Sequence, residues 1–186
     1  MESLIALEHS FWLVPVEPLK SRLRALISSL AQSCDAVDFE PHVTLWCGAS
    51  NDESSKRTAL ALADRFSAAE LAPTTIGHTD EYTKSLFVQF APSPVAEAMF
   101  EAIGRSSAAP SAYRLQPHLS LVYKGLPLET KRSICETLEL PQGPYRFDRL
   151  RVIETEIPLM RSAQIRKWRE VFDCALRAEF ADGRPK

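Results

Sequence analysis

The sequence reads FEPHVTLW at residues 39–46 and LQPHLSLV at residues 115–122. Both stretches run apolar, polar, Pro, His, apolar, hydroxyl, Leu, apolar, and together they contain two of the four histidines of the chain. Two copies of one pattern are typical of a fold built from two related units. We therefore expect the copies to lie symmetrically about one cleft.

Each copy is compact and is preceded by proline, which predicts a strand with a stiff, extended entry. Side chains alternate between the two faces of a strand, so His42 shares a face with Thr44. By the same rule His118 shares a face with Ser120, and the apolar residues between them face the core. This alternation puts Cys47 on the core face, opposite His42.

Two imidazoles and two hydroxyls around one pocket suit phosphodiester cleavage without a metal or another cofactor. A neutral His takes a proton from water and a protonated His gives one to the leaving alkoxide, and imidazole adopts both forms near neutral pH. The hydroxyls of Thr44 and Ser120 can donate to phosphate oxygens. We take His42 as the acid and His118 as the base, although the symmetry of the two motifs leaves the reverse assignment open.

A zinc site is the alternative use of the same residues. It would combine His42, His118 and a cysteine, but the cysteines at positions 34, 47, 135 and 174 form no CxxC pair. They resemble the reduced thiols of an intracellular protein. We predict that the protein binds no metal.

Composition narrows the class of protein further. The chain has 186 residues, 22 basic and 24 acidic side chains, and a formal net charge of −2. This balance excludes a broadly basic protein that coats duplex nucleic acid. The N-terminus is acidic where a signal peptide would be basic, and no apolar run is long enough to cross a membrane. We expect a cytoplasmic protein with no membrane contact, and a monomer.

Short apolar runs interleave with helical patterns along the chain, which predicts a mixed α and β fold. The expected strands lie at residues 10–16, 43–47, 85–90, 119–123 and 147–153. The expected helices lie at residues 18–33, 53–69, from 93 onward, and 127–138. The second helix should be capped by Asn51 or Asp52 and should bury Leu60. Residues 165–176 are ambiguous, because apolar side chains recur at helical spacing in a segment rich in β-formers.

Three stretches resemble the two-histidine (2H) phosphoesterase superfamily, whose hallmark is a pair of H-x-T/S motifs: SFWLVP at 10–15, FEPHVT at 39–44 and PHLSLVY at 117–123. Within it, the sequence is similar to the cyclic phosphodiesterases of the plant and yeast type, and the likeness extends to the segments around Leu150 and Trp168. The resemblance implies an α+β fold with one bilobal domain over residues 1–186. Two pseudo-symmetric lobes, each with an antiparallel sheet and outer helices, would surround a central cleft. The resemblance also makes residues 165–176 a strand.

The resemblance assigns roles to the motif residues. His42 and His118 match the catalytic pair, and Thr44 and Ser120 match the phosphate-binding hydroxyls. Tyr123 matches a tyrosine that contacts phosphate. Strand alternation puts Tyr123 on the face opposite His118, so a bulge or the end of the strand must turn it inward.

The implied activity is metal-independent hydrolysis of small cyclic phosphates. The family's substrates are 2',3'-cyclic nucleotides, opened to nucleoside 2'-phosphates, and ADP-ribose 1'',2''-cyclic phosphate, a by-product of tRNA splicing, opened to ADP-ribose 1''-phosphate. One alternative is an enzyme for RNA ends that carry a 2',3'-cyclic phosphate or a 2',5' linkage. Its basic surface would have to come from Arg22, Arg24, Lys124, Lys131, Arg132 and residues 146–151. The other alternative is a non-enzymatic sensor that binds a nucleotide or cyclic phosphate.

Overall fold

The computed structural model describes residues 6–107 and 110–178. Its strands form one antiparallel sheet in the order β3-β7-β1-β2-β6-β5-β4, and β8 pairs with β7 beside this path. The strands are β1 (Ala6–Pro15), β2 (Val43–Gly48), β3 (Ala69–Leu71), β4 (Pro73–His78), β5 (Leu86–Phe90), β6 (His118–Val122), β7 (Tyr145–Ile157) and β8 (Arg169–Ala175). The helices are α1 (Leu19–Ser33), α2 (Asp52–Arg65), α3 (Pro94–Ser106), α4 (Leu128–Thr137), α5 (Ser162–Ile165) and the 3-10 turn η1 (Tyr82–Lys84). The mixed α+β class is confirmed.

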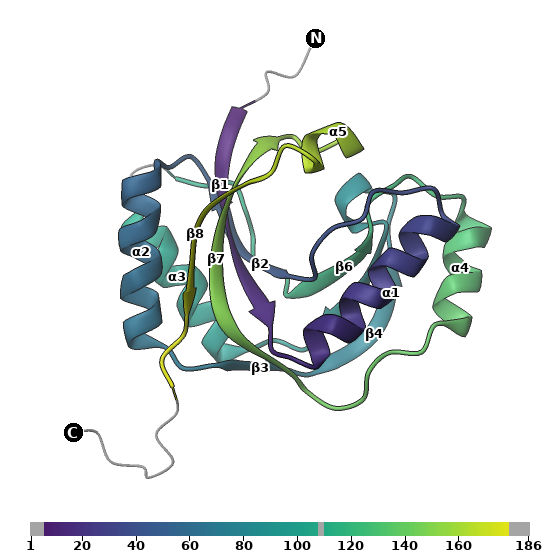
Figure 1. The fold of residues 1–186 in the computed structure, drawn as a ribbon, viewed down its shortest axis with the longest axis horizontal. Helices are drawn as coiled ribbons and strands as arrows, with labels where there is room; N and C mark the ends of the chain where they lie inside the picture. Colours follow the sequence, from purple (N-terminus) through teal and green to yellow (C-terminus); the bar gives the residue numbers. More distant parts are fainter. Residues whose placement is uncertain (1–5, 108–109, 179–186) are drawn as a thin grey trace.

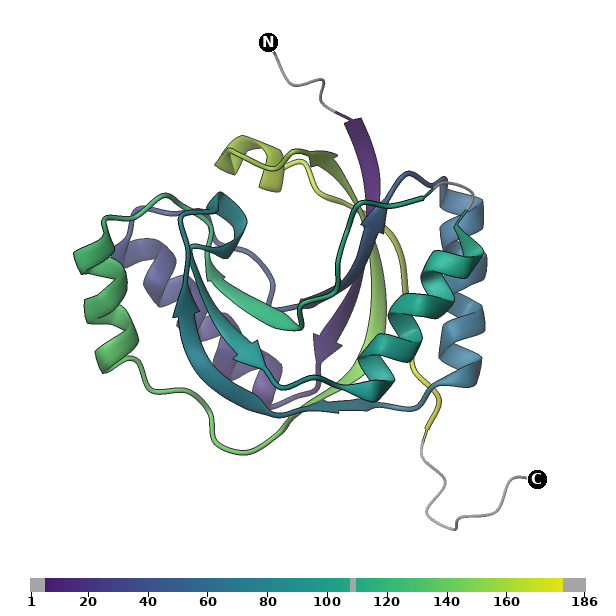
Figure 2. The ribbon, with the colours of Figure 1, turned by 180° about the vertical axis from the view of Figure 1, so that it is seen from behind.

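The sheet consists of two halves that meet at one strand pair. Strands β1, β2, β3, β7 and β8 form one half, and β4, β5 and β6 form the other. The halves join where Val43 of β2 lies opposite Leu119 of β6. Helices α2 and α3 lie over the first half, and α1 and α4 lie over the second (Figures 1 and 2).

The helices are exchanged between the two halves of the chain. Helix α1 lies between β1 and β2 in the sequence, yet it packs against β6. Helix α3 lies between β5 and β6, yet it packs against β2. Each half of the sheet is therefore covered by one helix from each half of the sequence.

Strand β2 contains a β-bulge at Leu45. Trp12 of β1 lies opposite Thr44, whereas the preceding Phe11 lies opposite Trp46. Leu45 is therefore the extra residue of the pair, and a bulge of this kind reverses the alternation of the side chains that follow it.

Strand β6 contains a matching bulge at Leu121. Phe87 of β5 lies opposite Ser120, whereas the preceding Leu86 lies opposite Val122. The two bulges occupy the same place relative to the two histidine motifs, so the repeat seen in the sequence is also a repeat of backbone geometry.

Helix α2 differs in part from its prediction. Its cap is confirmed, because the Asn51 side chain accepts a hydrogen bond of 2.9 Å from the backbone N–H three residues on. The helix ends before residue 69, since the chain from Ala69 forms β3. The expectation that Leu60 is buried is wrong: its side chain is 48% exposed, and Ala59 and Leu62 lie on the buried face instead.

The C-terminal segment resolves the ambiguity at residues 165–176. The helical spacing does not produce a helix here: α5 ends at Ile165, where the segment begins, and β8 then pairs with β7, so the strand expected from the family resemblance is confirmed. Strands β3 and β4 were not expected, because AEL is very short and PTTIGH contains Pro and Gly.

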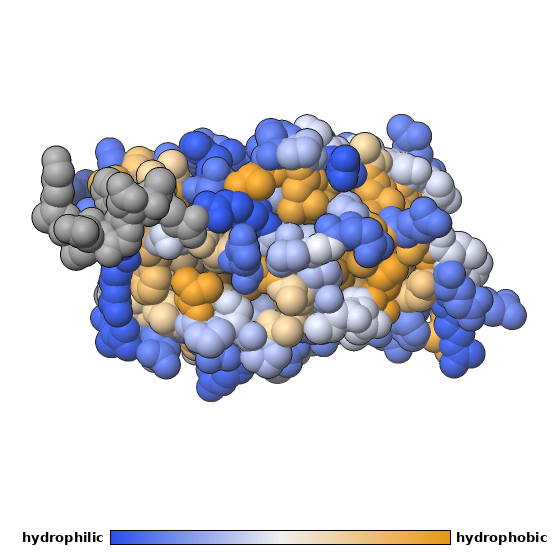
Figure 3. Space-filling model, turned by 90° about the horizontal axis from the view of Figure 1, so that it is seen from below, coloured by the Kyte–Doolittle hydropathy of each residue, from blue (hydrophilic) through white to orange (hydrophobic). Residues whose placement is uncertain are grey.

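On the face seen in Figure 3, hydrophobic side chains lie among hydrophilic ones, as on most protein surfaces. Within the described ranges, no helix is long and apolar enough to cross a membrane.

A buried lysine ties α4 to the turn between β4 and η1. Lys131 is 1% exposed, and its ammonium group donates to the backbone carbonyl of Thr79 (2.8 Å) and to the carboxylate of Asp80 (2.6 Å). A buried ammonium group is tolerated only when it is bonded in this way. The contact fixes the backbone that leads into η1.

We predict that Lys131→Met lowers the free energy of unfolding by about 1–3 kcal/mol, because it leaves the Thr79 carbonyl without its charged donor. Urea denaturation measures the change. Arg132→Met is the matched control, since Arg132 is an exposed neighbour on the same helix and should change the free energy by less than about 0.5 kcal/mol. Equal effects of the two substitutions would contradict this role of Lys131.

Candidate active site

The two motif histidines occupy equivalent positions where the halves of the sheet meet. His42 immediately precedes Val43 of β2, and His118 is the first residue of β6. The Nδ1 atom of His42 lies 2.7 Å from the Glu40 carbonyl, and that of His118 lies 2.6 Å from the Gln116 carbonyl. A carbonyl only accepts hydrogen bonds, so Nδ1 carries the proton in both rings. In the neutral imidazole this leaves the lone pair on Nε2.

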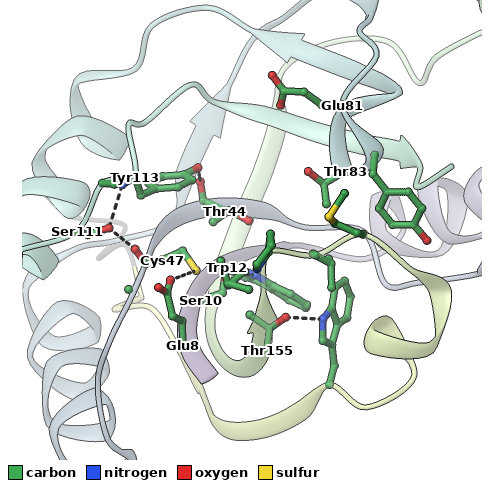
Figure 4. A pocket seen from close by; sticks show the side chains of 18 of the residues that line it. Glu8, Ser10, Trp12, Thr44, Cys47, Glu81, Thr83, Ser111, Tyr113 and Thr155 are labelled. Carbon is green, nitrogen blue, oxygen red and sulfur yellow. Dashed lines mark hydrogen bonds between the residues drawn. The ribbon is translucent and has the colours of Figure 1, made fainter. Parts of the chain in front are cut away.

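Both histidines line one cavity of about 780 Å³. The cavity also takes residues from β1, from the segment before β6, from the η1 turn and from the chain that follows β7 (Figure 4). The two rings influence one another, because charge on His118 lowers the pKa of His42. The expectation that both motifs meet at one cavity therefore holds for the histidines.

Aromatic rings hold His42 on two sides. Trp12 stacks on its ring at a centroid distance of 3.6 Å and an angle of 11°, and Trp168 meets it edge-on at 5.9 Å. Both indoles are themselves fixed: Trp12 donates to the Ser10 hydroxyl (2.7 Å) and Trp168 to the Thr155 hydroxyl (2.9 Å). The His42 ring is therefore held in one orientation.

His118 has a more open environment. Phe87 meets its ring edge-on at a centroid distance of 5.6 Å. The side chain of His118 is partly exposed, whereas His42 is 4% exposed. The two imidazoles are thus matched in hydrogen bonding but differ in burial.

Burial lowers the pKa of both histidines, because removal from water disfavours the charged form. The pKa of His42 falls to about 4, even though its bond to the Glu40 carbonyl acts in the opposite direction. The pKa of His118 is also lowered by burial, with the Gln116 carbonyl opposing the change. Both rings are therefore neutral near pH 7 in the free protein.

The two motif hydroxyls are placed differently. Thr44 lines the cavity. Ser120 is 4% exposed, and its hydroxyl donates to the Thr83 carbonyl at 2.7 Å. It is not among the residues that line the cavity in the described part of the chain. The structure therefore brings Thr44, but not Ser120, to the wall beside the histidines.

Tyr123 lines the cavity despite the alternation expected for its strand. The bulge at Leu121 and the end of β6 at Val122 turn it inward, which meets the condition set by the sequence. Its hydroxyl lies 3.4 Å from Nε2 of His42, and its ring stacks on Phe39 at 4.1 Å. Burial raises the pKa of Tyr123, so the phenol stays protonated and can act as a donor.

Cys47 corrects one expectation. It lines the cavity rather than the core, because the bulge at Leu45 reverses its side chain just as the bulge at Leu121 reverses Tyr123. Its thiol donates to the Glu8 carboxylate at 3.3 Å. Burial raises the pKa of Cys47, which keeps it a thiol and a poor metal ligand or nucleophile.

Tyr113, Trp168, Glu8 and Glu81 also line the cavity and were not found from the sequence. The Tyr113 hydroxyl donates to the Thr44 carbonyl at 2.9 Å, across a large sequence separation. No periodic pattern marks these residues. A positional signal existed only for Cys47, which lies five residues after the first motif histidine, as Tyr123 lies five residues after the second.

Three residues outside the cavity have the geometry of a metal cluster: His9, Asp52 and Glu154. The Arg169 guanidinium already donates to both carboxylates, at 2.9–3.0 Å. It supplies the positive charge that a metal ion would bring. Within residues 6–107 and 110–178, no such cluster combines His42, His118 and Cys47.

Comparisons with known proteins agree with this geometry. A family model described as cyclic phosphodiesterase-like protein matches residues 7–108, which include the first motif and end before the second. The crystal structure of E. coli LigT complexed with 3'-AMP superposes with a TM-score of 0.57 and 16% sequence identity, over 92% of this chain and 98% of LigT. The crystal structure of a phosphoesterase superposes with a TM-score of 0.56 and 16% identity, over 93% of this chain and 100% of the other. A comparison with curated protein sequences finds no match.

The fold and its central pair of histidine motifs define a two-histidine (2H) phosphoesterase. The family match covers more than half of the sequence. The chain belongs to the cyclic phosphodiesterase-like family.

We predict that an NMR titration of the free protein gives a His42 midpoint near pH 4, with the proton on Nδ1 above it. The His42→Gln variant assigns the signal. Because the unfolded chain takes up this proton near the ordinary pKa of about 6.5, the free energy of unfolding should fall as the pH falls from 6.5 to 4. A His42 midpoint near 6.5 would contradict the buried, stacked environment.

Proposed function

We propose that the protein hydrolyses small cyclic phosphates without a metal, using His42 and His118 as an acid–base pair. The observation that carries the proposal is the matched fixing of both imidazoles. Each Nδ1 is bonded to a carbonyl two residues earlier in the chain, which leaves each Nε2 for chemistry in one shared cavity. A pure sensor has little need for two imidazoles held in this way.

Hydrolysis adds water across the ring ester of the cyclic phosphate. One neutral imidazole takes a proton from the water as its oxygen bonds to phosphorus, and the other gives a proton to the ring oxygen as its bond to phosphorus breaks. Both rings are neutral in the free protein near pH 7, so one must take up a proton when the anionic substrate arrives. A phosphate anion favours this uptake because it stabilises the imidazolium.

Neutral donors would stabilise the charge that grows on the phosphate oxygens. Thr44 and Tyr123 line the cavity, and Tyr123 lies beside Nε2 of His42. The phosphate-binding role of Ser120 stays a prediction. It requires the hydroxyl to turn from the Thr83 carbonyl toward the substrate.

We infer that the substrates are 2',3'-cyclic nucleotides and ADP-ribose 1'',2''-cyclic phosphate, with nucleoside 2'-phosphates and ADP-ribose 1''-phosphate as products. Family membership and the aromatic walls around His42 support a nucleotide-sized cyclic phosphate. LigT, which has a similar fold, has been crystallised with 3'-AMP, ATP and NADP+. A role in tRNA splicing metabolism would follow from the second substrate.

The alternative of an RNA-end enzyme finds less support in the placement of the basic residues. None of its candidate cations lines the cavity in the described part of the chain. Arg24 pairs with Asp38, and Lys131 is buried against Asp80. Arg151 is held by several carboxylates.

A cytoplasmic location and a monomeric state stay predictions.

We predict that His42→Ala and His118→Ala each lower kcat on a 2',3'-cyclic nucleotide by about 10²- to 10⁴-fold, the usual scale for a positioned acid or base. The chelator EDTA should leave the wild-type rate unchanged. His78→Ala is the matched control, since His78 ends β4 and does not line the cavity. Wild-type protein that opens no cyclic phosphate, or does so only with added metal, would overturn the proposed function.

The assignment of His42 as the acid and His118 as the base can be tested with leaving groups of different basicity. An aryl phosphodiester with a nitrophenolate leaving group needs no protonation of the departing oxygen. On this substrate His42→Ala should recover most of its lost rate, whereas His118→Ala should stay slow. The opposite pattern would exchange the two roles and leave the paired mechanism intact.

A further inference from the structure

The cavity that holds the two histidines has an unusual charge for a phosphate site. Within the described ranges, its lining contains two carboxyl side chains, Glu8 and Glu81, and no Lys or Arg. In Figure 4 the two carboxyl groups lie on opposite sides of Thr44. Phosphate groups with two charges are usually held by Arg, Lys or a metal ion.

The remaining polar groups of the lining are neutral near pH 7. Burial lowers the pKa of both histidines and raises the pKa of Cys47, Tyr113 and Tyr123. In the free protein these groups offer hydrogen bonds to an anion but no opposing charge, and the single positive charge of one protonated imidazole balances one phosphate charge. Their hydrogen bonds serve a singly and a doubly charged phosphate alike.

Several cations act on lining groups from outside the lining: Lys84 on His118, Arg151 on His42 and Arg166 on Tyr82. The Lys84 ammonium donates to the Gln116 side chain at 2.8 Å and lies 4.6 Å from the centroid of the Phe87 ring. Its charge lowers the pKa of His118, while Glu81 acts in the opposite direction.

Arg151 lowers the pKa of His42, and Glu40 raises it. Arg151 is bonded to both Glu40 and Asp173, which reduces its effect on the cavity. Glu8 and Glu81 therefore face neutral groups across the cavity and meet no lining cation in the described part of the chain.

We propose that this site selects a singly charged phosphodiester and rejects the doubly charged phosphomonoester, with Glu8 and Glu81 as the residues that set the preference. The proposal rests on the proposed function, because it concerns the same cavity. A cyclic phosphodiester carries one negative charge. Its hydrolysis product carries two above a second pKa of about 6, and the second proton goes to solvent. The added charge meets two carboxyl groups, which drives the product out.

The test compares two ligands that differ by one methyl group and one charge: 2'-deoxyadenosine 3'-monophosphate and its methyl phosphodiester. Calorimetry measures their binding to the wild-type protein at pH 7.5 and at pH 5. At pH 7.5 the methyl ester should bind roughly tenfold more tightly, the scale of one charge–charge interaction in a partly solvated site. At pH 5 both ligands carry one charge, so their dissociation constants should become equal.

At pH 7.5, Glu8→Gln and Glu81→Gln should each reduce the difference between the two dissociation constants, because the monoester binds more tightly when one carboxyl group is removed. The double variant should remove most of this difference. Glu139→Gln is the matched control, because Glu139 is exposed in the loop after α4 and lies outside the lining. Its ratio of dissociation constants should equal that of the wild type.

Two outcomes separate this proposal from the proposed function. If the protein hydrolyses cyclic nucleotides but binds the monoester as tightly as the methyl ester at pH 7.5, the charge selection is wrong and the hydrolytic function stands. If the protein neither hydrolyses cyclic phosphates nor binds either ligand, the proposed function fails, and the charge selection fails with it.

Discussion

The site depends on the pairing of β2 with β6, where Val43 lies opposite Leu119. This contact brings the starts of two strands together and therefore brings together the histidines that precede or begin them. The exchanged helices α1 and α3 pack against β6 and β2, so they brace the junction from both sides. A shift of either strand by one residue would turn its imidazole away from the cavity.

The chemistry follows from how the two imidazoles are held rather than from their presence alone. Two backbone carbonyls fix the tautomer, and burial keeps both rings neutral in the free protein. A site that combines two neutral imidazoles with two lining carboxyl groups is poorly suited to a highly charged ligand. Its hydroxyl and imidazole groups suit a singly charged phosphodiester, whose arrival would itself supply the charge that protonates one ring.

The sequence was sufficient for the repeat, the fold class and the meeting of His42 and His118, because strand alternation and motif repetition are local properties. The sequence was insufficient to predict the orientation of the Cys47 side chain, because this orientation depends on a bulge that arises from the register of β2 against β1. The inward orientation of Tyr123 depends in the same way on the equivalent bulge in β6. The burial of Leu60 was predicted wrongly, and the exchange of the helices was not predicted at all. Tertiary packing decides which face of a helix is buried and which element covers it, and the sequence pattern alone does not contain that information.

The central claim is that two histidines in one cavity, both neutral in the free protein and one of them protonated when the substrate binds, open a cyclic phosphate with water and no metal. Phosphorus NMR of a 2',3'-cyclic nucleotide, turned over in oxygen-labelled water with excess chelator, tests it most directly. The account predicts a single nucleoside 2'-phosphate that carries one labelled oxygen on phosphorus. Unchanged cyclic substrate, or turnover that returns only with added metal, would contradict it.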